Sequence, residues 1–267
     1  MKLLVTGGAG YLGSEIAARA EARGWDVLAT QLERKPPAGR PVRLDIRDED
    51  EAVRRFLEHS PQVVIHTAYR QAEEEVWAAI VAGTRNVARA AALVGARLVH
   101  LSTDLIFDGE RDGRYTEADE PSPVGPYGKA KLAAELLAAE LHPEALIVRT
   151  SLLYGKPGPQ ERLALREDIA FYDDEIRTPL RVDELAAALL ELAGTELAGV
   201  LHVAGPDAVS RFELARLLAA AQGRDPGELR PASAPPGRSR NVALDSSRAY
   251  ALLQTRIRGV KEVLHPL

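Results

Sequence analysis

The N-terminal stretch TGGAGYLG (residues 6–13) restricts the fold of this chain more than any other feature. It follows the apolar run LLV and opens a segment in which apolar residues have helical spacing. Glycines three residues apart permit a tight turn, the close approach of a pyrophosphate to the backbone, and close packing of the helix on the strand. The helix N-terminus that follows favours a negatively charged group. We therefore predict a dinucleotide-binding turn, with contacts from Gly7, Gly10, Tyr11, Leu12 and Gly13.

Strand-like and helix-like patterns alternate through the first 150 residues. Strands are expected at 2–6, 26–30, 42–44, 63–66, 97–101 and 145–149, and helices at 11–23, 49–58, 73–94 and 127–141. Such alternation implies parallel strands joined by right-handed crossovers. The runs LLV, VVI and ALIV are apolar enough to be buried on both faces. We therefore predict an α/β fold, a Rossmann-type doubly wound parallel sheet with a small C-terminal substrate lobe.

The regular alternation weakens after Thr150. A helix is expected at 182–193, a strand at 200–204 and a helix at 211–222. Four prolines between 226 and 240 indicate an ordered surface segment or a lid. We predict a dinucleotide-binding domain at 1–150, to which elements around 180–204 return, and a mainly substrate-binding lobe at 151–267.

Composition narrows the possible classes of function. The formal net charge of −5 disfavours a nucleic-acid partner, and the absence of cysteine excludes disulfides and thiolate catalysis. The histidines lack the i, i+4 spacing of a helical zinc site, so we expect no metal. Charged residues interrupt the most apolar stretch, 185–204, which therefore cannot span a bilayer. We expect a cytoplasmic protein without a membrane partner, and we leave a homodimer open.

Residues at the end of the second strand indicate which cofactor fits. An acid there would bond the ribose 2′-hydroxyl of NAD. The aligned residue here, Gln31, is neutral and is followed by Arg34 and Lys35. This pattern favours NADP(H), while NAD(H) stays open because two cations are also ordinary in a solvated loop. Further cofactor contacts are expected after the third and fourth strands, at Asp45, Ile46, Thr67, Ala68 and Tyr69.

Tyr127 and Lys131 are one helical turn apart in the stretch GPYGKAKLAAE. A tyrosine, with a pKa of about 10, is a poor acid–base group at neutral pH unless a nearby cation stabilises its phenolate. Such a pair is usually a coincidence. Ser102 and Thr103, however, stand at the carboxyl end of the fifth strand, the sheet edge at which ligands bind. We therefore predict catalytic roles for Thr103, Tyr127 and Lys131, and cofactor contacts from Ser102, Tyr127 and Lys131.

These motifs together resemble the extended short-chain dehydrogenase/reductase family and, within it, the dTDP-4-dehydrorhamnose reductases. The resemblance covers most of the chain and rests on TGGAGYLG, STDLIFDG, YTEADEPSPVGPYGKAKLAAE and RTSLLYG, with looser matches in RTPLRVDELA, GVLHVAGPDAVSRFELA and RSRNVALDSSRA. It implies an NAD(P)-dependent oxidoreductase that reduces the C4 ketone of a nucleotide-linked 4-keto-6-deoxysugar. It also implies that Thr103 orients the ketone oxygen, that Tyr127 protonates it, and that Lys131 binds the nicotinamide ribose and lowers the pKa of the tyrosine.

The chain also differs from this family. Ile80 stands where the family carries an asparagine that braces the active site, and Leu152 where it carries an aromatic residue near the substrate. The stretch between Gly155 and Asp174 is shorter. Leu105 replaces an acid of the related dehydratases, which argues against dehydration. Two alternatives stay open. One is a non-catalytic NADP-binding regulatory subunit, as in relatives that serve methionine adenosyltransferase; the other is an epimerase or another carbonyl reductase of the family.

Overall fold

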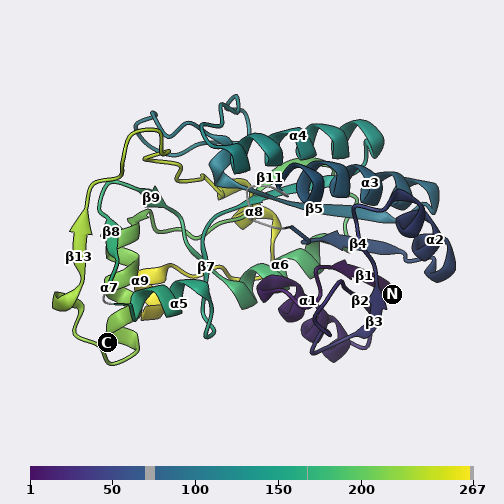
Figure 1. Cartoon of the computed structure of the whole chain (residues 1–267), viewed down its shortest axis with the longest axis horizontal. Helices are drawn as coiled ribbons and strands as arrows, with labels where there is room; N and C mark the ends of the chain where they lie inside the picture. Colours follow the sequence, from purple (N-terminus) through teal and green to yellow (C-terminus); the bar gives the residue numbers. More distant parts are fainter. Residues whose placement is uncertain (70–75, 167, 265–267) are drawn as a thin grey trace. The chain divides into compact units, whose positions relative to one another are not determined.

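The computed structural model describes residues 1–69, 76–166 and 168–264, which form two compact units (Figure 1). The first unit comprises Met1–Ser102, Lys129–Val148 and Ala186–Leu201. The second unit takes its described residues from Thr103–Gly128, Arg149–Leu185 and His202–Leu267. Each unit therefore draws on three separate segments of the chain. The predicted division into a dinucleotide-binding domain at 1–150 and a mainly substrate-binding lobe at 151–267 concerns function, so it stays a prediction.

The first unit is built on a seven-stranded sheet with the order β11-β6-β5-β4-β1-β2-β3. β1 pairs in parallel with β2 and β4, β2 pairs with β3, and β4 pairs with β5. The strands are β1 (Lys2–Thr6), β2 (Asp26–Gln31), β3 (Arg40–Arg43), β4 (Val63–His66), β5 (Arg97–Thr103), β6 (Leu146–Thr150) and β11 (Gly199–His202). The strand order reverses between β1 and β4, the position at which doubly wound sheets bind ligands. The predicted Rossmann-type parallel sheet is confirmed.

Helices cover both faces of this sheet: α2, α3 and α4 lie on one side in Figure 1, and α1 and α6 on the other. Their bounds are α1 (Tyr11–Ala22), α2 (Glu49–His59), α3 (Gly83–Leu93), α4 (Pro126–Leu141) and α6 (Val182–Leu192). Leu3, Leu4 and Val5 of β1 are fully buried, as a central strand covered on both faces requires. Phe56 of α2 is also fully buried in the core, and burying such a side chain contributes about 1.5–3 kcal/mol.

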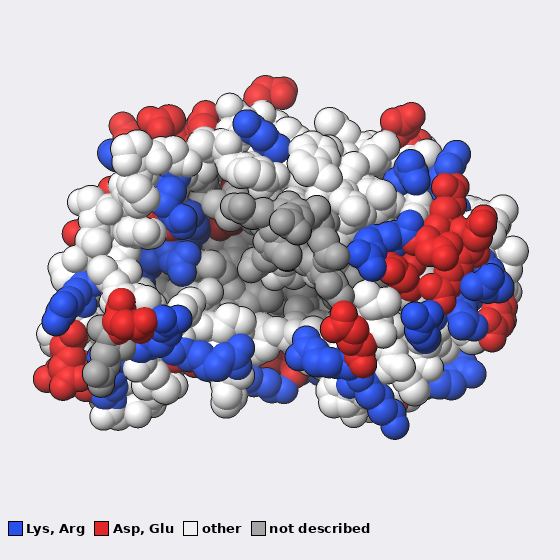
Figure 2. Space-filling model, in the orientation of Figure 1, with Lys and Arg blue, Asp and Glu red and all other residues white. Residues whose placement is uncertain are grey.

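The sequence of α2 shows how local chemistry fixes an element. The Asp48 side chain caps the helix by accepting a hydrogen bond from the Glu51 backbone N–H (2.9 Å). The first turn carries Glu49, Asp50 and Glu51, and negative charge there is stabilised by the helix dipole. Acidic side chains accordingly gather over α2, at the right of Figure 2.

The described part of the second unit is built from short elements. Three two-stranded sheets pair β7 (Leu153–Tyr154) with β10 (Leu180–Arg181), β8 (Ala170–Tyr172) with β13 (Arg230–Ala232), and β9 (Ile176–Arg177) with β12 (Val209–Ser210). The helical elements are η3 (Asp104–Ile106), α5 (Pro159–Ala164), α7 (Arg211–Ala221), η4 (Pro226–Glu228), α8 (Ser247–Leu252) and α9 (Val260–Leu264). Tyr154, Phe171 and Leu218 belong to the hydrophobic core of this unit.

Some expected elements need correction. The third strand is Arg40–Arg43 rather than 42–44, because it pairs with the stretch Leu28–Gln31 of β2. The helix expected at 73–94 contains a π-helix, η2 (Trp77–Ala82), before α3, and its first residues lie outside the described ones. The segment 226–240 contains η4 and the paired strand β13, so it is ordered. The strands of the second unit are too short for a sequence period to reveal.

Candidate active site

The turn after β1 has a backbone geometry that depends on its glycines. Gly7 has a φ of +70°, which residues with a side chain rarely adopt. A Cβ on Gly13 would lie 2.2 Å from the Gly7 carbonyl oxygen, so α1 can begin this close to the loop only with glycine at 13. A Cβ on Gly10 would meet only the same oxygen, at 3.0 Å. The turn therefore presents bare backbone at Gly7 and Gly10.

A cavity of about 370 Å³ lies over this turn, where β1, β2, β3 and β4 end. Nine predicted cofactor residues line it: Gly7, Gly10, Gln31, Arg34, Asp45, Ile46, Thr67, Ala68 and Tyr69. The other lining residues were not predicted: Ala9, Thr30, Leu32, Glu33, Leu44, Arg47 and Ala79. Most of these are sequence neighbours of predicted residues, a signal that could have found them. Ala79, from η2, had no such signal.

Four charged residues line this cavity: Glu33, Arg34, Asp45 and Arg47. Arg47 donates to both carboxylate oxygens of Asp45, from Nε (2.9 Å) and from Nη2 (2.7 Å). The Asp45 carboxylate, predicted to contact the cofactor, already forms an ion pair with Arg47. Arg34 is exposed. The Gln31 Oε1 atom is buried and has no hydrogen-bond partner among the described residues.

His66, at the end of β4, joins the first unit's central strands. Its Nδ1 lies 2.6 Å from the Thr6 hydroxyl and its Nε2 lies 3.1 Å from the Thr84 hydroxyl. Burial, with a smaller effect from the nearby Lys131 ammonium, lowers the pKa of His66 to about 3. The same Thr6 hydroxyl accepts the backbone N–H of Thr67 (3.1 Å). His66 is therefore a neutral anchor that fixes the cavity wall after β4.

Lys131 is almost fully buried in the first unit, 5% exposed. Its Nζ donates to the Leu101 carbonyl oxygen (2.9 Å) and lies 5.4 Å from the centre of the Tyr69 ring. Burial lowers the pKa of Lys131 to about 8, against the opposing effect of Glu135. Ser102, the next residue after Leu101 on β5, has a buried hydroxyl with no partner among the described residues.

Thr103 and Tyr127 belong to the second unit. Thr103 is the last residue of β5, and its hydroxyl donates to Asp104 Oδ1 (3.1 Å). Tyr127 is half-buried in the first turn of α4. A Cβ on the adjacent Gly128 would lie 2.0 Å from the Leu105 carbonyl oxygen. Glycine at 128 therefore lets the start of α4 pack directly on the segment that follows Thr103, which places Thr103 and Tyr127 in one neighbourhood.

The positions at which the chain departs from its predicted family are apolar. Ile80, in η2, is 1% exposed and belongs to the buried hydrophobic residues of the first unit. Leu152 is half-buried and packs against the hydrophobic core of the second unit. In the shortened stretch after Gly155, the helix α5 has only six residues.

A family model described as "RmlD substrate binding domain" matches residues 1–266. A dTDP-4-dehydrorhamnose reductase from Mycobacterium tuberculosis is 36% identical over 94% of this chain and 86% of its own length. The chain belongs to the dTDP-4-dehydrorhamnose reductase family. Its predicted class, an oxidoreductase of the extended short-chain dehydrogenase/reductase type, is confirmed.

Two further similarities bear on function in this family. The crystal structure of a dTDP-4-dehydrorhamnose reductase from Bacillus anthracis in complex with NADP has a TM-score of 0.85 and 29% identity, and covers 99% of this chain and 98% of that one. Methionine adenosyltransferase 2 subunit beta from Rattus norvegicus is 28% identical over 99% of this chain and 87% of its own length.

Within 1–69, 76–166 and 168–264, no group of three or more His, Asp or Glu side chains is arranged to hold a metal ion. None of the helices in these ranges has the length and apolar character needed to cross a membrane.

Proposed function

We propose that this protein is an NADP(H)-dependent reductase of a nucleotide-linked 4-keto-6-deoxysugar. The observation that carries the proposal is the packing of Gly128 on Leu105, which puts the start of the Tyr127–Lys131 helix beside the end of β5. The proposal is supported by family relatives named for reduction of dTDP-4-dehydrorhamnose. NADP(H) is supported by the neutral Gln31 and by the NADP in the related structure. A cytoplasmic location remains our prediction, and a homodimer stays open.

The first unit has the features that a bound dinucleotide needs. Gly7 and Gly10 leave backbone facing the cavity, and the start of α1 offers N–H groups to a pyrophosphate. The buried Gln31 Oε1 can accept a hydrogen bond from a ribose hydroxyl. Arg34, exposed at the cavity rim, would pair with a 2′-phosphate.

The chemistry divides between cofactor and side chains. When bound, the reduced nicotinamide would supply a hydride to the carbonyl carbon. Tyr127 would donate its phenol proton to the carbonyl oxygen, which leaves a phenolate on the enzyme. The Lys131 ammonium would stabilise that phenolate by its charge. Because its pKa is about 8, Lys131 is still mostly protonated at pH 7 and can do so.

A second candidate is a regulatory subunit that binds NADP without turning it over. It is favoured by the apolar Ile80 at a position where catalysts of the family carry an asparagine. It is also favoured by the similarity to methionine adenosyltransferase 2 subunit beta. Such a protein would bind the cofactor tightly, show no turnover with keto-sugar nucleotides, and change the rate of a partner enzyme.

The decisive experiment follows NADPH absorbance in the presence of dTDP-4-keto-6-deoxy-L-lyxo-hexose, with NADH in parallel. We expect rapid loss of NADPH in the wild type. Tyr127→Phe should lower kcat by about 10²-fold or more, as for loss of a general acid, with little change in NADPH affinity. Full turnover by this variant would remove Tyr127 from its proposed role.

The matched control is Tyr250→Phe, which removes a phenol hydroxyl outside the candidate site. The Tyr250 hydroxyl donates to the Ala204 carbonyl oxygen (2.7 Å), and its loss should leave kcat unchanged. Tight NADPH binding by the wild type without turnover would favour the regulatory candidate.

A further inference from the structure

The second unit contains a cavity that the proposed mechanism does not use. It has a volume of about 310 Å³ and lies where the helices α5, α7 and α9 come together, at the lower left of Figure 1. All of the described residues that line it belong to this unit, and none of them was predicted as a catalytic or cofactor-binding residue. A cavity of about 150 Å³ is enough to hold benzene, so this cavity has room for a small organic molecule.

Glu161, from α5, is the least exposed charged residue of the lining, at 9%. Its Oε1 accepts a hydrogen bond from the Gly155 backbone N–H, whereas its Oε2 is buried and has no hydrogen-bond partner among the described residues. None of the described cations forms an ion pair with this carboxylate. Burying a charge without a partner is costly, so Glu161 has the geometry of a residue that binds a ligand.

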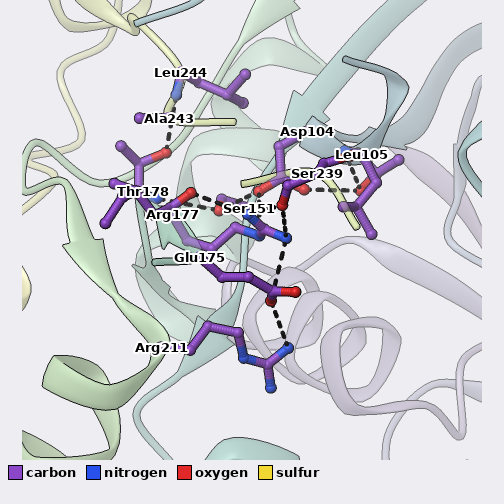
Figure 3. Close-up of polar contacts among 12 residues, drawn as sticks. Asp104, Leu105, Ser151, Glu175, Arg177, Thr178, Arg211, Ser239, Ala243 and Leu244 are labelled. Carbon is purple, nitrogen blue, oxygen red and sulfur yellow. Dashed lines mark hydrogen bonds and ion pairs between the residues drawn. The ribbon is translucent and has the colours of Figure 1, made fainter. Parts of the chain in front are cut away.

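Other buried carboxylates of the same unit have cationic partners. Figure 3 shows Glu175 between Arg177 and Arg211. Glu175 Oε2 lies 3.5 Å from Arg177 Nη2 and 3.9 Å from Arg211 Nη1. Arg177 Nε in turn lies 3.8 Å from Oδ2 of Asp104. Glu161, by contrast, keeps one oxygen for a partner that the described chain does not supply.

Two cations also line the cavity, and neither is paired with Glu161. Arg181 donates to the Asp183 carboxylate from Nε (2.8 Å) and from Nη2 (3.0 Å). Lys156 is exposed, so solvent screens its charge. The buried charge of the lining is therefore negative, and it favours a cationic ligand. A calcium ion would need six to eight oxygen ligands, which one free carboxylate oxygen does not provide.

The remaining lining is suited to a hydrocarbon chain. Leu218 belongs to the hydrophobic core of this unit, and Val263 and Leu264 of α9 pack against that core. The buried hydroxyl of Tyr154, which has no partner among the described residues, adds a second polar group to the lining. A ligand with a charged donor at one end and an apolar body at the other matches this combination.

We propose that this cavity binds a small primary amine. The ammonium group donates to Glu161 Oε2, and the aliphatic chain packs against Leu218, Val263 and Leu264. An ammonium group carries three donors and no acceptor, and its hydrogen bonds to a carboxylate are strengthened by charge. The site goes beyond the proposed reductase function and does not depend on it.

The test is an NMR titration at pH 7 that follows the Gly155 backbone amide, because this group donates to Glu161. Three compounds with one hydrocarbon body and different polar ends serve as probes: isopentylamine, isopentanol and isovalerate. We expect the amine to bind with a Kd of about 1 mM or tighter, the alcohol about tenfold more weakly, and the acid not at all. Equal affinity for amine and alcohol would overturn the inference. No saturable shift with the amine would show that the cavity holds water only, and would overturn it too.

Glu161→Gln removes the charge and keeps an oxygen that can accept the Gly155 N–H. The variant should bind isopentylamine about tenfold more weakly or worse. The matched control is Glu262→Gln on α9, whose exposed carboxylate lies outside the lining and pairs with Arg256 (2.8 Å). Its affinity for the amine should stay within about twofold of the wild type. Unchanged affinity in Glu161→Gln would remove Glu161 from the proposed site and overturn the inference.

Ala221→Leu provides a second variant should Glu161→Gln fail to fold. Ala221 is an exposed residue at the end of α7 that lines the cavity, so a larger side chain there reduces the volume without removing a buried contact. Amine binding should weaken about tenfold or more; undiminished binding would place the amine elsewhere. NADPH turnover measured on the same samples keeps the two proposals separate. Absence of turnover in the wild type would count against the reductase function and leave the amine titration to decide this one.

Discussion

Gly13→Ala should destabilise the first unit, because the added methyl group would clash with the backbone carbonyl group of Gly7. The added Cβ would lie 2.2 Å from the Gly7 carbonyl oxygen and 2.8 Å from its carbon. Ordinary contact needs about 3.5 Å, so the loop or the helix must move by roughly 1 Å. The obstacle is backbone, so we take the upper end of the overpacking cost, about 3 kcal/mol. Alanine recovers about 1 kcal/mol of helix preference, which leaves a net loss of about 2 kcal/mol.

Urea unfolding followed by tryptophan fluorescence measures this loss in the relevant unit. The chain has two tryptophans, Trp25 and Trp77, and both belong to the first unit. Gly10→Ala is the control: its Cβ meets only one atom, at 3.0 Å, and Gly10 has an ordinary φ of −78°. We expect it to unfold within about 0.5 kcal/mol of the wild type and to bind NADPH more weakly, because its methyl group faces the cavity.

A separate result would refute the prediction made for each of these two variants. A Gly13→Ala protein as stable as the wild type would show that the approach of α1 to the loop is not constrained as described. Unaltered NADPH affinity in Gly10→Ala would show that the pyrophosphate binds elsewhere.

Three other predictions concern the cofactor and the buried polar groups. Arg34→Ala should weaken NADPH binding about tenfold and leave NADH binding unchanged. Lys35 lies outside the cavity lining, so Lys35→Ala should change the binding of neither cofactor. Equal NADPH binding curves for the two variants would refute this prediction. The folded-state pKa values of His66 and His202 are lowered by burial to about 3 and about 4. Between pH 6 and pH 4 the unfolded chain therefore binds protons that the folded chain does not. The unfolding free energy, measured by urea titration, should fall as pH falls, by up to about 1.4 kcal/mol per pH unit for each histidine; a flat profile would contradict this. Tyr154→Phe should not lower the unfolding free energy, because the buried hydroxyl has no partner among the described residues; a loss above about 1 kcal/mol would show otherwise.

The sequence predicted the parts of the fold that follow from local patterns. The runs LLV and VVI are fully apolar, and β1 and β4 are indeed central strands buried in the sheet. The glycine spacing predicted the turn over which the cavity lies, because Gly10 and Gly13 both approach the carbonyl oxygen of Gly7, at most six residues away. Thr103 was placed correctly at the end of β5 for the same reason: strand length and position are local properties.

The sequence could not predict features that depend on distant contacts. Asp104 and Arg177 are 73 residues apart, and nothing near either residue indicates that they meet. The sheets of the second unit join two- and three-residue strands, which have no period of their own.

The interleaving of the two units along the chain has a consequence for synthesis on the ribosome. β11, an edge strand of the first unit, neighbours β6 in the sheet but is encoded roughly 50 residues later. At about 5–20 residues per second, β6 emerges several seconds before its partner exists. During that interval β6 is an unpaired edge, which can pair with other chains. The order of segments thus sets a period in which the nascent sheet is incomplete, and slower translation of residues 151–198 would lengthen it.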